Sequence, residues 1–139
     1  MKWLLDTNAF SEPGRARPDA GFADWFERTD EADMVLSVVT IGEMDRGLAL
    51  MAEGARKIRL EAINRGALQA FDGHILPIDL RTARLWGDLS ARLKADGLNF
   101  GVPDEMIAAT ALQHGLTVVS RDRRPFDASG CRVLSPWSE

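Results

Sequence analysis

Short apolar runs alternate with longer segments of helical periodicity along this chain. The runs are rich in Leu, Val and Ile and end at polar or turn-forming residues, which is the pattern of buried strands. They predict five short strands, at residues 3–5, 34–39, 75–78, 117–120 and 131–134. Pro77 lies within the third run and limits the pairing of that strand, because proline donates no backbone hydrogen bond.

Between these runs, apolar residues recur every three or four positions, which is the spacing of one face of a helix. The predicted helices cover residues 19–28, 40–53, 55–71, 80–96 and 103–114. Asp79 is placed to cap the fourth helix and Gly115 to end the fifth, whose apolar sequence predicts burial. Residues 13–18 contain two prolines and a glycine, and they predict a loop or a broken helix.

The order of the predicted elements is strand, helices, strand, helices, strand, two helices, strand and strand. Such alternation predicts an α/β fold with a central, mostly parallel sheet flanked by helices. The 139 residues suit a single domain, residues 1–139, with one hydrophobic core. No internal repeat, low-complexity tract or linker divides them.

Four acidic residues lie where the carboxyl edge of this sheet would collect them. Asp6 ends the first predicted strand, and Asp122 closely follows the fourth. Glu43 lies in the first turn of the helix predicted from Thr40, and Asp104 lies in the first turn of the apolar helix. Ligands of open parallel sheets bind outside the carboxyl ends of the strands, so these four side chains are candidates for one site.

Carboxylates brought together in one site repel one another unless a cation neutralises them. Hard oxygen ligands favour Mg²⁺, with Mn²⁺ as a substitute, and such a cation polarises a phosphoryl oxygen and promotes the formation of hydroxide from water. The two histidines, His74 and His114, are poorly placed to act with the acids, and the phosphate-binding loop G-x-x-x-x-G-K-[ST] is absent. The net charge of −4 argues against electrostatic wrapping around nucleic acid, but it leaves phosphate contact through a cation open.

Each acid also has a purely structural interpretation, and the sequence leaves both interpretations open. Thr40 and Glu43 match a capping box, and Asp104 suits the positive end of its helix dipole. Asp6 can form a turn, although a carboxylate directly after a buried strand is costly without a partner. Asp122 lies among three arginines, so a surface ion pair is the simpler interpretation of that residue alone.

The segments that carry these acids form a recognisable series over the whole chain. They are residues 4–8 (LLDTN), 36–43 (LSVVTIGE), 104–111 (DEMIAATA), 114–116 (HGL), 119–122 (VSRD) and 133–137 (VLSPW). Each motif is weak alone, but together and in this order they resemble PIN-domain ribonucleases. The resemblance is strongest to the VapC-type toxins of bacterial toxin–antitoxin pairs, including the FitB-like branch.

The resemblance assigns roles to particular residues. It implies that the metal-binding and catalytic acids are Asp6, Glu43, Asp104 and, as a more variable fourth position, Asp122. It also implies that polar side chains beside the metal orient the substrate, namely Thr7, Asn8 and Ser120. The family often carries a further Asp directly before Phe126, where this chain has Pro125, so a four-acid site depends on Asp122.

The implied activity is hydrolysis of RNA phosphodiester bonds by a Mg²⁺- or Mn²⁺-dependent endoribonuclease, the toxin of a type II toxin–antitoxin system. The implied partners are the RNA substrate, a cognate antitoxin protein and a second copy of the chain. Arg121 and Arg123 flank Asp122 and are candidate phosphate contacts, although a solvated loop explains them equally well.

Two functions of other classes remain to be compared with this one. A catalytically silent PIN-fold domain that binds nucleic acid or a regulatory partner requires a broken acidic set, whereas all four positions here are acidic. A phosphoryl-accepting, receiver-like domain requires a Lys after a late strand, where this chain has Arg121 and Asp122. The single cysteine, the lack of an apolar run of about 20 residues and the lack of a signal-peptide core predict a cytoplasmic protein without membrane contact.

Overall fold

The computed structural model describes residues 1–138, and its centre is a five-stranded sheet in the order β3-β2-β1-β4-β5. The strands are β1 (Trp3–Leu5), β2 (Met34–Ser37), β3 (Ile75–Leu76), β4 (Thr117–Val119) and β5 (Arg132–Leu134). Each neighbouring pair is parallel, which confirms the predicted sheet and its α/β class. The carboxyl ends of all five strands therefore lie along the same edge.

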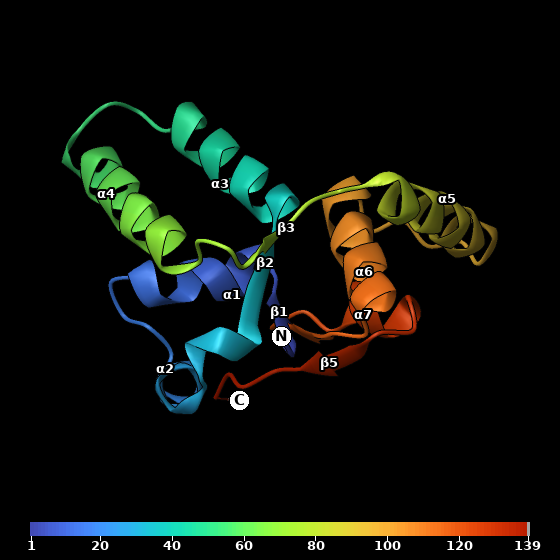
Figure 1. Ribbon diagram of the computed structural model, residues 1–139. Helices are drawn as coiled ribbons and strands as arrows, with labels where there is room; N and C mark the ends of the chain where they lie inside the picture. Colours follow the sequence, from blue (N-terminus) through green and yellow to red (C-terminus); the bar gives the residue numbers. More distant parts are fainter. Residues whose placement is uncertain (139) are drawn as a thin grey trace.

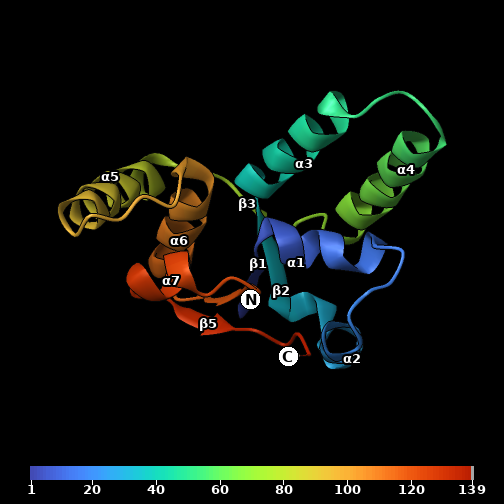
Figure 2. The same ribbon diagram turned by 180° about the vertical axis from the view of Figure 1, so that it is seen from behind.

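Helices cover both faces of the sheet. They are α1 (Thr7–Ser11), α2 (Ala20–Arg28), α3 (Val38–Leu50), α4 (Ala55–Ala70), α5 (Leu80–Ala95), α6 (Val102–His114) and α7 (Arg124–Ala128), with single 3-10 turns η1 (Glu12–Gly14) and η2 (Glu31–Asp33). Figure 1 shows α1, α3 and α4 on one side of the sheet and α5, α6 and α7 on the other, and the reverse view in Figure 2 shows the same division.

Alternating side chains of the strands form two hydrophobic cores. Leu4, Val35 and Val118 face α5 and α6, where they pack with Leu93 and Ile107. The residues that follow them in the strands point the opposite way, because successive side chains of a strand alternate between faces. These are Leu5, Leu36 and Val119, which pack with α1, α2 and Trp137 near the C-terminus.

The junction between β2 and α3 differs from the sequence prediction. The strand ends at Ser37, whose hydroxyl accepts a hydrogen bond from the Val39 amide at 3.0 Å and caps a helix that begins at Val38. Two β-branched valines favour a strand by propensity, but this cap is a stronger local signal. Thr40 is therefore fully buried inside the helix, and the predicted capping box between Thr40 and Glu43 is wrong.

Other helix boundaries follow the predicted signals. Asp79 caps α5 by accepting from the Thr82 amide at 2.9 Å, and Gly115 ends α6 with φ of 66°, in the left-handed region that glycine favours. Among residues 1–138, no helix combines the length and the apolar content that crossing a membrane requires.

Candidate metal and active site

The four predicted acids lie at the carboxyl edge of the sheet, on segments that follow three adjacent strands and at the start of a buried helix. Asp6 follows the central strand β1, while Glu43 in α3 and Asp122 come after its two neighbours, β2 and β4. Asp104 lies in the first turn of α6. From β1 the chain passes to β2 on one side, while β4 pairs with β1 on its other side. The carboxyl end of β1 is therefore a topological switch point, where α/β proteins bind ligands.

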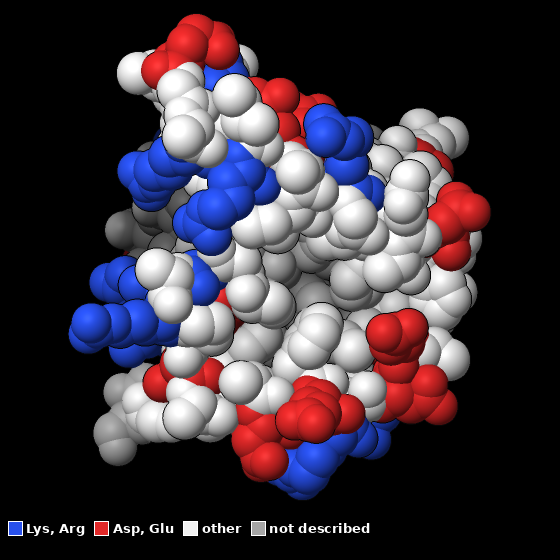
Figure 3. Space-filling model, turned by 90° about the vertical axis from the view of Figure 1, so that its left-hand side faces the viewer, with Lys and Arg blue, Asp and Glu red and all other residues white. Residues whose placement is uncertain are grey.

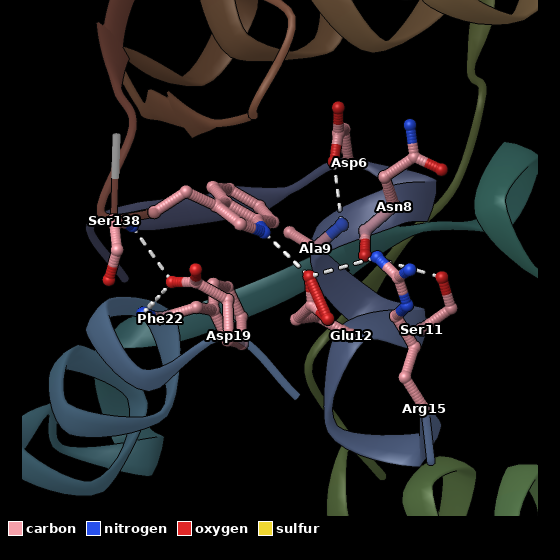
Figure 4. Close-up of polar contacts among 10 residues, drawn as sticks. Asp6, Asn8, Ala9, Ser11, Glu12, Arg15, Asp19, Phe22 and Ser138 are labelled. Carbon is pink, nitrogen blue, oxygen red and sulfur yellow. Dashed lines mark hydrogen bonds and ion pairs between the residues drawn. The ribbon is translucent and has the colours of Figure 1, made fainter. Parts of the chain in front are cut away.

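Asp6 is the most deeply buried of the four acids, with 5% of its surface exposed. Its side chain caps α1 by accepting a hydrogen bond from the Ala9 amide at 2.8 Å (Figure 4). Burial raises the pKa of this carboxyl above its ordinary value, the nearby Ser120 hydroxyl and the Ala9 amide lower the pKa in part, and the charges of Glu43 and Asp122 raise it again. Ser120 is itself fully buried, so the predicted orienting residue adjoins the central acid.

Asp104 lies half-buried near the same negative charges. Burial is the largest cause that raises its pKa to about 6, and the carboxylates of Asp6, Glu43 and Asp122 add to the rise, with a smaller effect from Glu105. Since such charge effects act at short range in a protein, the four acids share one electrostatic environment. The helix-dipole interpretation of Asp104 alone does not produce this mutual repulsion.

Glu43 is tied to the first helical residue after the central strand. The Thr7 hydroxyl donates to Glu43 Oε1 at 2.5 Å, which joins α1 to α3. Because α3 begins at Val38, Glu43 lies in the second turn of the helix and not in the first turn that the sequence indicated. Asn8, the next predicted orienting residue, is exposed, and Figure 4 shows its amide pointing to the same side as the Asp6 carboxyl.

Asp122 is held by an arginine in the same loop. Its Oδ1 accepts from Arg124 Nε and its Oδ2 from Arg124 Nη2, each at 3.0 Å, and its side chain is 47% exposed. The pairing with Arg124 lowers the pKa of this carboxyl. The surface ion pair that the sequence left open is thus formed, while the charge of Asp122 still reaches Asp6 and Asp104.

Arg121 and Arg123 differ in how they are held. Arg123 lies 3.4 Å from Asp127 and donates to the carbonyl of Val133 at 3.3 Å, so its guanidinium is directed toward β5. Arg121 is exposed in the loop between β4 and α7. The sequence did not single out Arg124, since three arginines around one acid carry no signal of which one pairs with it.

The side chains as they stand do not form a closed metal cage. Among residues 1–138, no three side chains of His, Cys, Asp or Glu come close enough together to hold an ion between them. The donor set nevertheless fits a hard divalent cation, because its groups are carboxylates and their charges add to the raised pKa of Asp6 and of Asp104, so that a positive charge would be favourable there.

An apolar groove of about 1010 Å³ extends from Glu43 between α1, α3 and α4. Its apolar lining includes Phe10, Met44, Leu48, Leu60, Ile63 and Phe71. Four arginines also line it, namely Arg15, Arg17, Arg56 and Arg59. Figure 3 shows this face as a hollow floored by uncharged side chains, with most Lys and Arg on the left of the view and Asp and Glu around the rest of the rim.

Comparison with known proteins places the chain in a family. Residues 3–130 match the model of the PIN domain. The VapC ribonuclease Y4jK of Sinorhizobium fredii is 38% identical over 135 residues, which are 96% of this chain and 96% of that protein. Toxin FitB of Neisseria gonorrhoeae is 37% identical over 137 residues, which are 98% of this chain and 99% of that protein.

Solved structures give the same result. The crystal structure of FitAcB from Neisseria gonorrhoeae superposes with a TM-score of 0.89 at 38% identity, covering 97% of this chain and 98% of that one. PIN-domain nucleases generally depend on divalent metal ions, which agrees with the oxygen-rich edge described above. The sequence match, the parallel sheet and the acidic edge together show that the chain belongs to the PIN-domain family.

Proposed function

We propose that this protein is a Mg²⁺-dependent endoribonuclease, with Mn²⁺ as a substitute, and that it acts as the toxin of a type II toxin–antitoxin pair. The observation that carries the proposal is the gathering of four acids at the carboxyl edge of the sheet, where burial, together with the charges of Asp6, Glu43 and Asp122, raises the pKa of Asp104 to about 6. Relatives named as a VapC ribonuclease and as toxin FitB support the same activity.

Asp6, Glu43, Asp104 and Asp122 are the proposed metal ligands. A bound divalent cation would supply Lewis acidity toward a phosphoryl oxygen and a lowered pKa for a water molecule. Thr7 holds Glu43 through its hydroxyl, and the buried Ser120 holds the loop of Asp122 by donating to that residue's carbonyl at 2.9 Å. The exposed amide of Asn8 is placed to orient an RNA phosphate or ribose beside the acids.

Arg121 and Arg123 are proposed as phosphate contacts, and Arg121 is expected to contribute more to RNA binding. Arg121 is exposed beside the acidic edge and suits a phosphate of the strand being cut. Arg123 is already engaged by Asp127 and the Val133 carbonyl, so its contribution is smaller.

The apolar groove supports the proposed protein partner. Several solved relatives are complexes named FitAB or VapBC, each a toxin-like chain with a second protein. A segment with an apolar face and acidic residues would complement the groove and its arginines, and an occupant extending past Glu43 would cover the acids. We also propose that the chain forms homodimers, as the resemblance implies.

Asp6→Asn tests the catalytic proposal. Asparagine keeps an oxygen that can cap Ala9, so the fold should persist, but the charge at the centre of the acidic edge is lost. We expect cleavage of single-stranded RNA in Mg²⁺ or Mn²⁺ to fall by at least about 100-fold, since a metal's electrostatic contribution is several kcal/mol. Asp88→Asn, on the exposed face of α5, is the matched control.

The same assay separates the alternatives. Unchanged cleavage by Asp6→Asn would remove the proposed role of Asp6. A wild-type protein that binds RNA but cuts neither RNA nor single-stranded DNA of the same sequence would favour the silent, binding-only domain. Cutting DNA alone would assign a different substrate to the same site.

A further inference from the structure

A second buried carboxylate lies outside the acidic edge, at the far end of α1. Glu12 opens the turn η1 directly after α1 and is only 2% exposed. Its Oε1 accepts a hydrogen bond from the indole Nε1 of Trp137 at 2.6 Å, across 125 positions of sequence (Figure 4). Its Oε2 is buried without a hydrogen-bond partner in the part of the chain described.

The burial of the Glu12 carboxylate is not explained by a gain in stability. Arg15 offers a compensating charge, but it lies 3.5 Å from Oε1 and is largely exposed. A buried carboxylate with one good hydrogen bond and one unpartnered oxygen is destabilising relative to an apolar side chain of similar size. In some proteins a polar group kept in such a place specifies a geometry, so the question is what Glu12 holds in place.

The C-terminal segment presents Trp137 as a fixed donor. The Trp137 ring packs against Phe22 with 4.7 Å between ring centroids. The next residue, Ser138, donates its amide to Asp19 at 2.8 Å and accepts from the Gly21 amide at 2.9 Å. The start of α2 thereby holds the segment that carries Trp137, and Figure 4 shows Ser138 and Asp19 in this contact.

At its other end, α1 carries the centre of the acidic edge. Asp6 caps the helix, and Thr7, its first residue, donates to Glu43. The helix has five residues, and one or two turns have no independent stability, so its orientation depends on the core packing of Ala9 and Phe10 and on the contacts at its two ends. The two ends of α1 are held by Asp6 and by Glu12.

We propose that Glu12 is a positioning residue: anchored by Trp137, it fixes α1 so that Asp6 and Thr7 are held in register with Glu43. The effect of Glu12 on catalysis rests on the proposed function, but its effect on the position of α1 does not. The C-terminal segment is then part of the machinery that orients the acids, although it lies outside the acidic edge itself.

The test compares Trp137→Phe with Trp25→Phe by hydrogen exchange in metal-free protein. Both remove an indole from the same aromatic cluster, since Trp25 lies 5.8 Å from the Phe22 ring, but only the first removes the bond to Glu12. The reporters are the amides of Ala9 and Phe10, which donate to Asp6 Oδ1 at 2.8 Å and to the Asp6 carbonyl at 3.0 Å. We expect Trp137→Phe to speed their exchange about tenfold relative to strand amides, and to weaken Mn²⁺ binding about 10–100-fold.

A double variant separates positioning from the cost of an unpaired charge. Glu12→Met with Trp137→Phe removes both partners of the bond, so it should recover the melting temperature that Trp137→Phe loses. If Glu12 positions α1, fast exchange at Ala9 and Phe10 and weak Mn²⁺ binding persist in the double variant. The proposal would be overturned if the exchange rates and the Mn²⁺ affinity of the double variant returned to wild-type values. It would also be overturned if Trp25→Phe sped exchange at Ala9 and Phe10 as much as Trp137→Phe does. A wild-type protein that neither binds Mn²⁺ nor cuts RNA would refute the proposed function, while the exchange rates would still decide the role of Glu12.

Discussion

Replacing Asp104 by Asn should stabilise the metal-free protein at neutral pH. The two side chains have nearly the same size, so the change removes a charge with little effect on packing. Burial is the main cause of the raised pKa of Asp104, about 6, and the nearby charges of Asp6, Glu43 and Asp122 add to it. Because the folded protein favours the protonated form of Asp104, ionisation of this side chain lowers the free energy of unfolding.

The sign and size follow from proton linkage. The folded pKa of Asp104, about 6, lies above its ordinary value of 3.8, so the group's favourable contribution is complete below pH 3.8 and is lost as pH rises through 6. The full difference corresponds to about 3 kcal/mol. The carboxyl is only half-buried, so solvent screening reduces this to about 1.5 kcal/mol. Asparagine also gives up about 0.5 kcal/mol of helix-dipole interaction, which leaves about 1 kcal/mol.

Thermal unfolding in EDTA measures this difference. At pH 7.5 we expect Asp104→Asn to melt about 4 °C above the wild type. The advantage should shrink to about half at pH 5, where Asp104 is mostly protonated. Saturating Mn²⁺ should reverse the order, because ligand binding to the folded state stabilises the wild type more than a variant lacking one proposed ligand.

The exposed Asp88→Asn on α5 is the control and should show neither the gain nor the reversal. A lower melting temperature for Asp104→Asn in EDTA at pH 7.5 would show that the neighbouring acids do not repel Asp104. The shared electrostatic environment of the acidic edge would then be refuted.

Three further predictions concern other parts of the molecule. Gly21→Ala should destabilise the protein by about 2 kcal/mol in chemical denaturation, because a Cβ at Gly21 would lie 2.7 Å from the carbonyl oxygen of Pro136. Gly66→Ala is the control: a Cβ there has nothing within 4 Å, so this change should stabilise the protein by about 0.5 kcal/mol. Burial raises the pKa of the Cys131 thiol to about 11, so its reaction with a disulfide reagent at pH 8 should be at least about tenfold slower in native than in denatured protein. Thr7→Val removes the hydroxyl that holds Glu43, and calorimetry should show Mn²⁺ binding weakened about tenfold with little change in melting temperature.

The sheet could be predicted from the sequence because its strands pack on both faces. Leu4 and Leu5 face opposite cores, so both positions must be apolar, and a continuous apolar run results. Helix α5 was predictable because it has one buried stripe and a clear start signal at Asp79, and α6 because it is an apolar run that ends at Gly115. Conformation and burial agree in these elements.

The short helices α1 and α7 could not be predicted in this way. Each has five residues, which is less than two turns, so no apolar stripe can repeat. Their stability comes from contacts made elsewhere in the fold, such as the bond between Glu12 and Trp137. This is why the sequence indicated a possible turn at Asp6, whereas Asp6 in fact caps a helix that begins at Thr7.

The position of the acids was predictable, but their pairing was not. The carboxyl edge of a parallel sheet gathers whatever follows its strands, so topology alone brings Asp6, Glu43 and Asp122 to one region. Which side chain each acid contacts depends on rotamers and loop geometry, and these placed Arg124 on Asp122 and Thr7 on Glu43. A resemblance between motifs therefore predicts the region in which the acids lie, but not which side chains they contact.

The pairing of Asp122 with Arg124 changes how the acidic edge should be understood. The ion pair is largely exposed, and exposed pairs contribute little to stability, so it does not compete strongly with a divalent cation for the Asp122 carboxylate. Its effect is on the metal-free protein, where it lowers the pKa of Asp122 and keeps that carboxylate ionised although Asp6 and Asp104 resist ionisation. Arg124→Gln should therefore leave Asp122 as a competent ligand but raise its pKa. Since Asp104, with a pKa of about 6, ionises at a higher pH than Asp122, the pH at which Mn²⁺ binding begins should stay unchanged in Arg124→Gln, and a raised onset would show that Arg124 is needed to keep Asp122 ionised in that range.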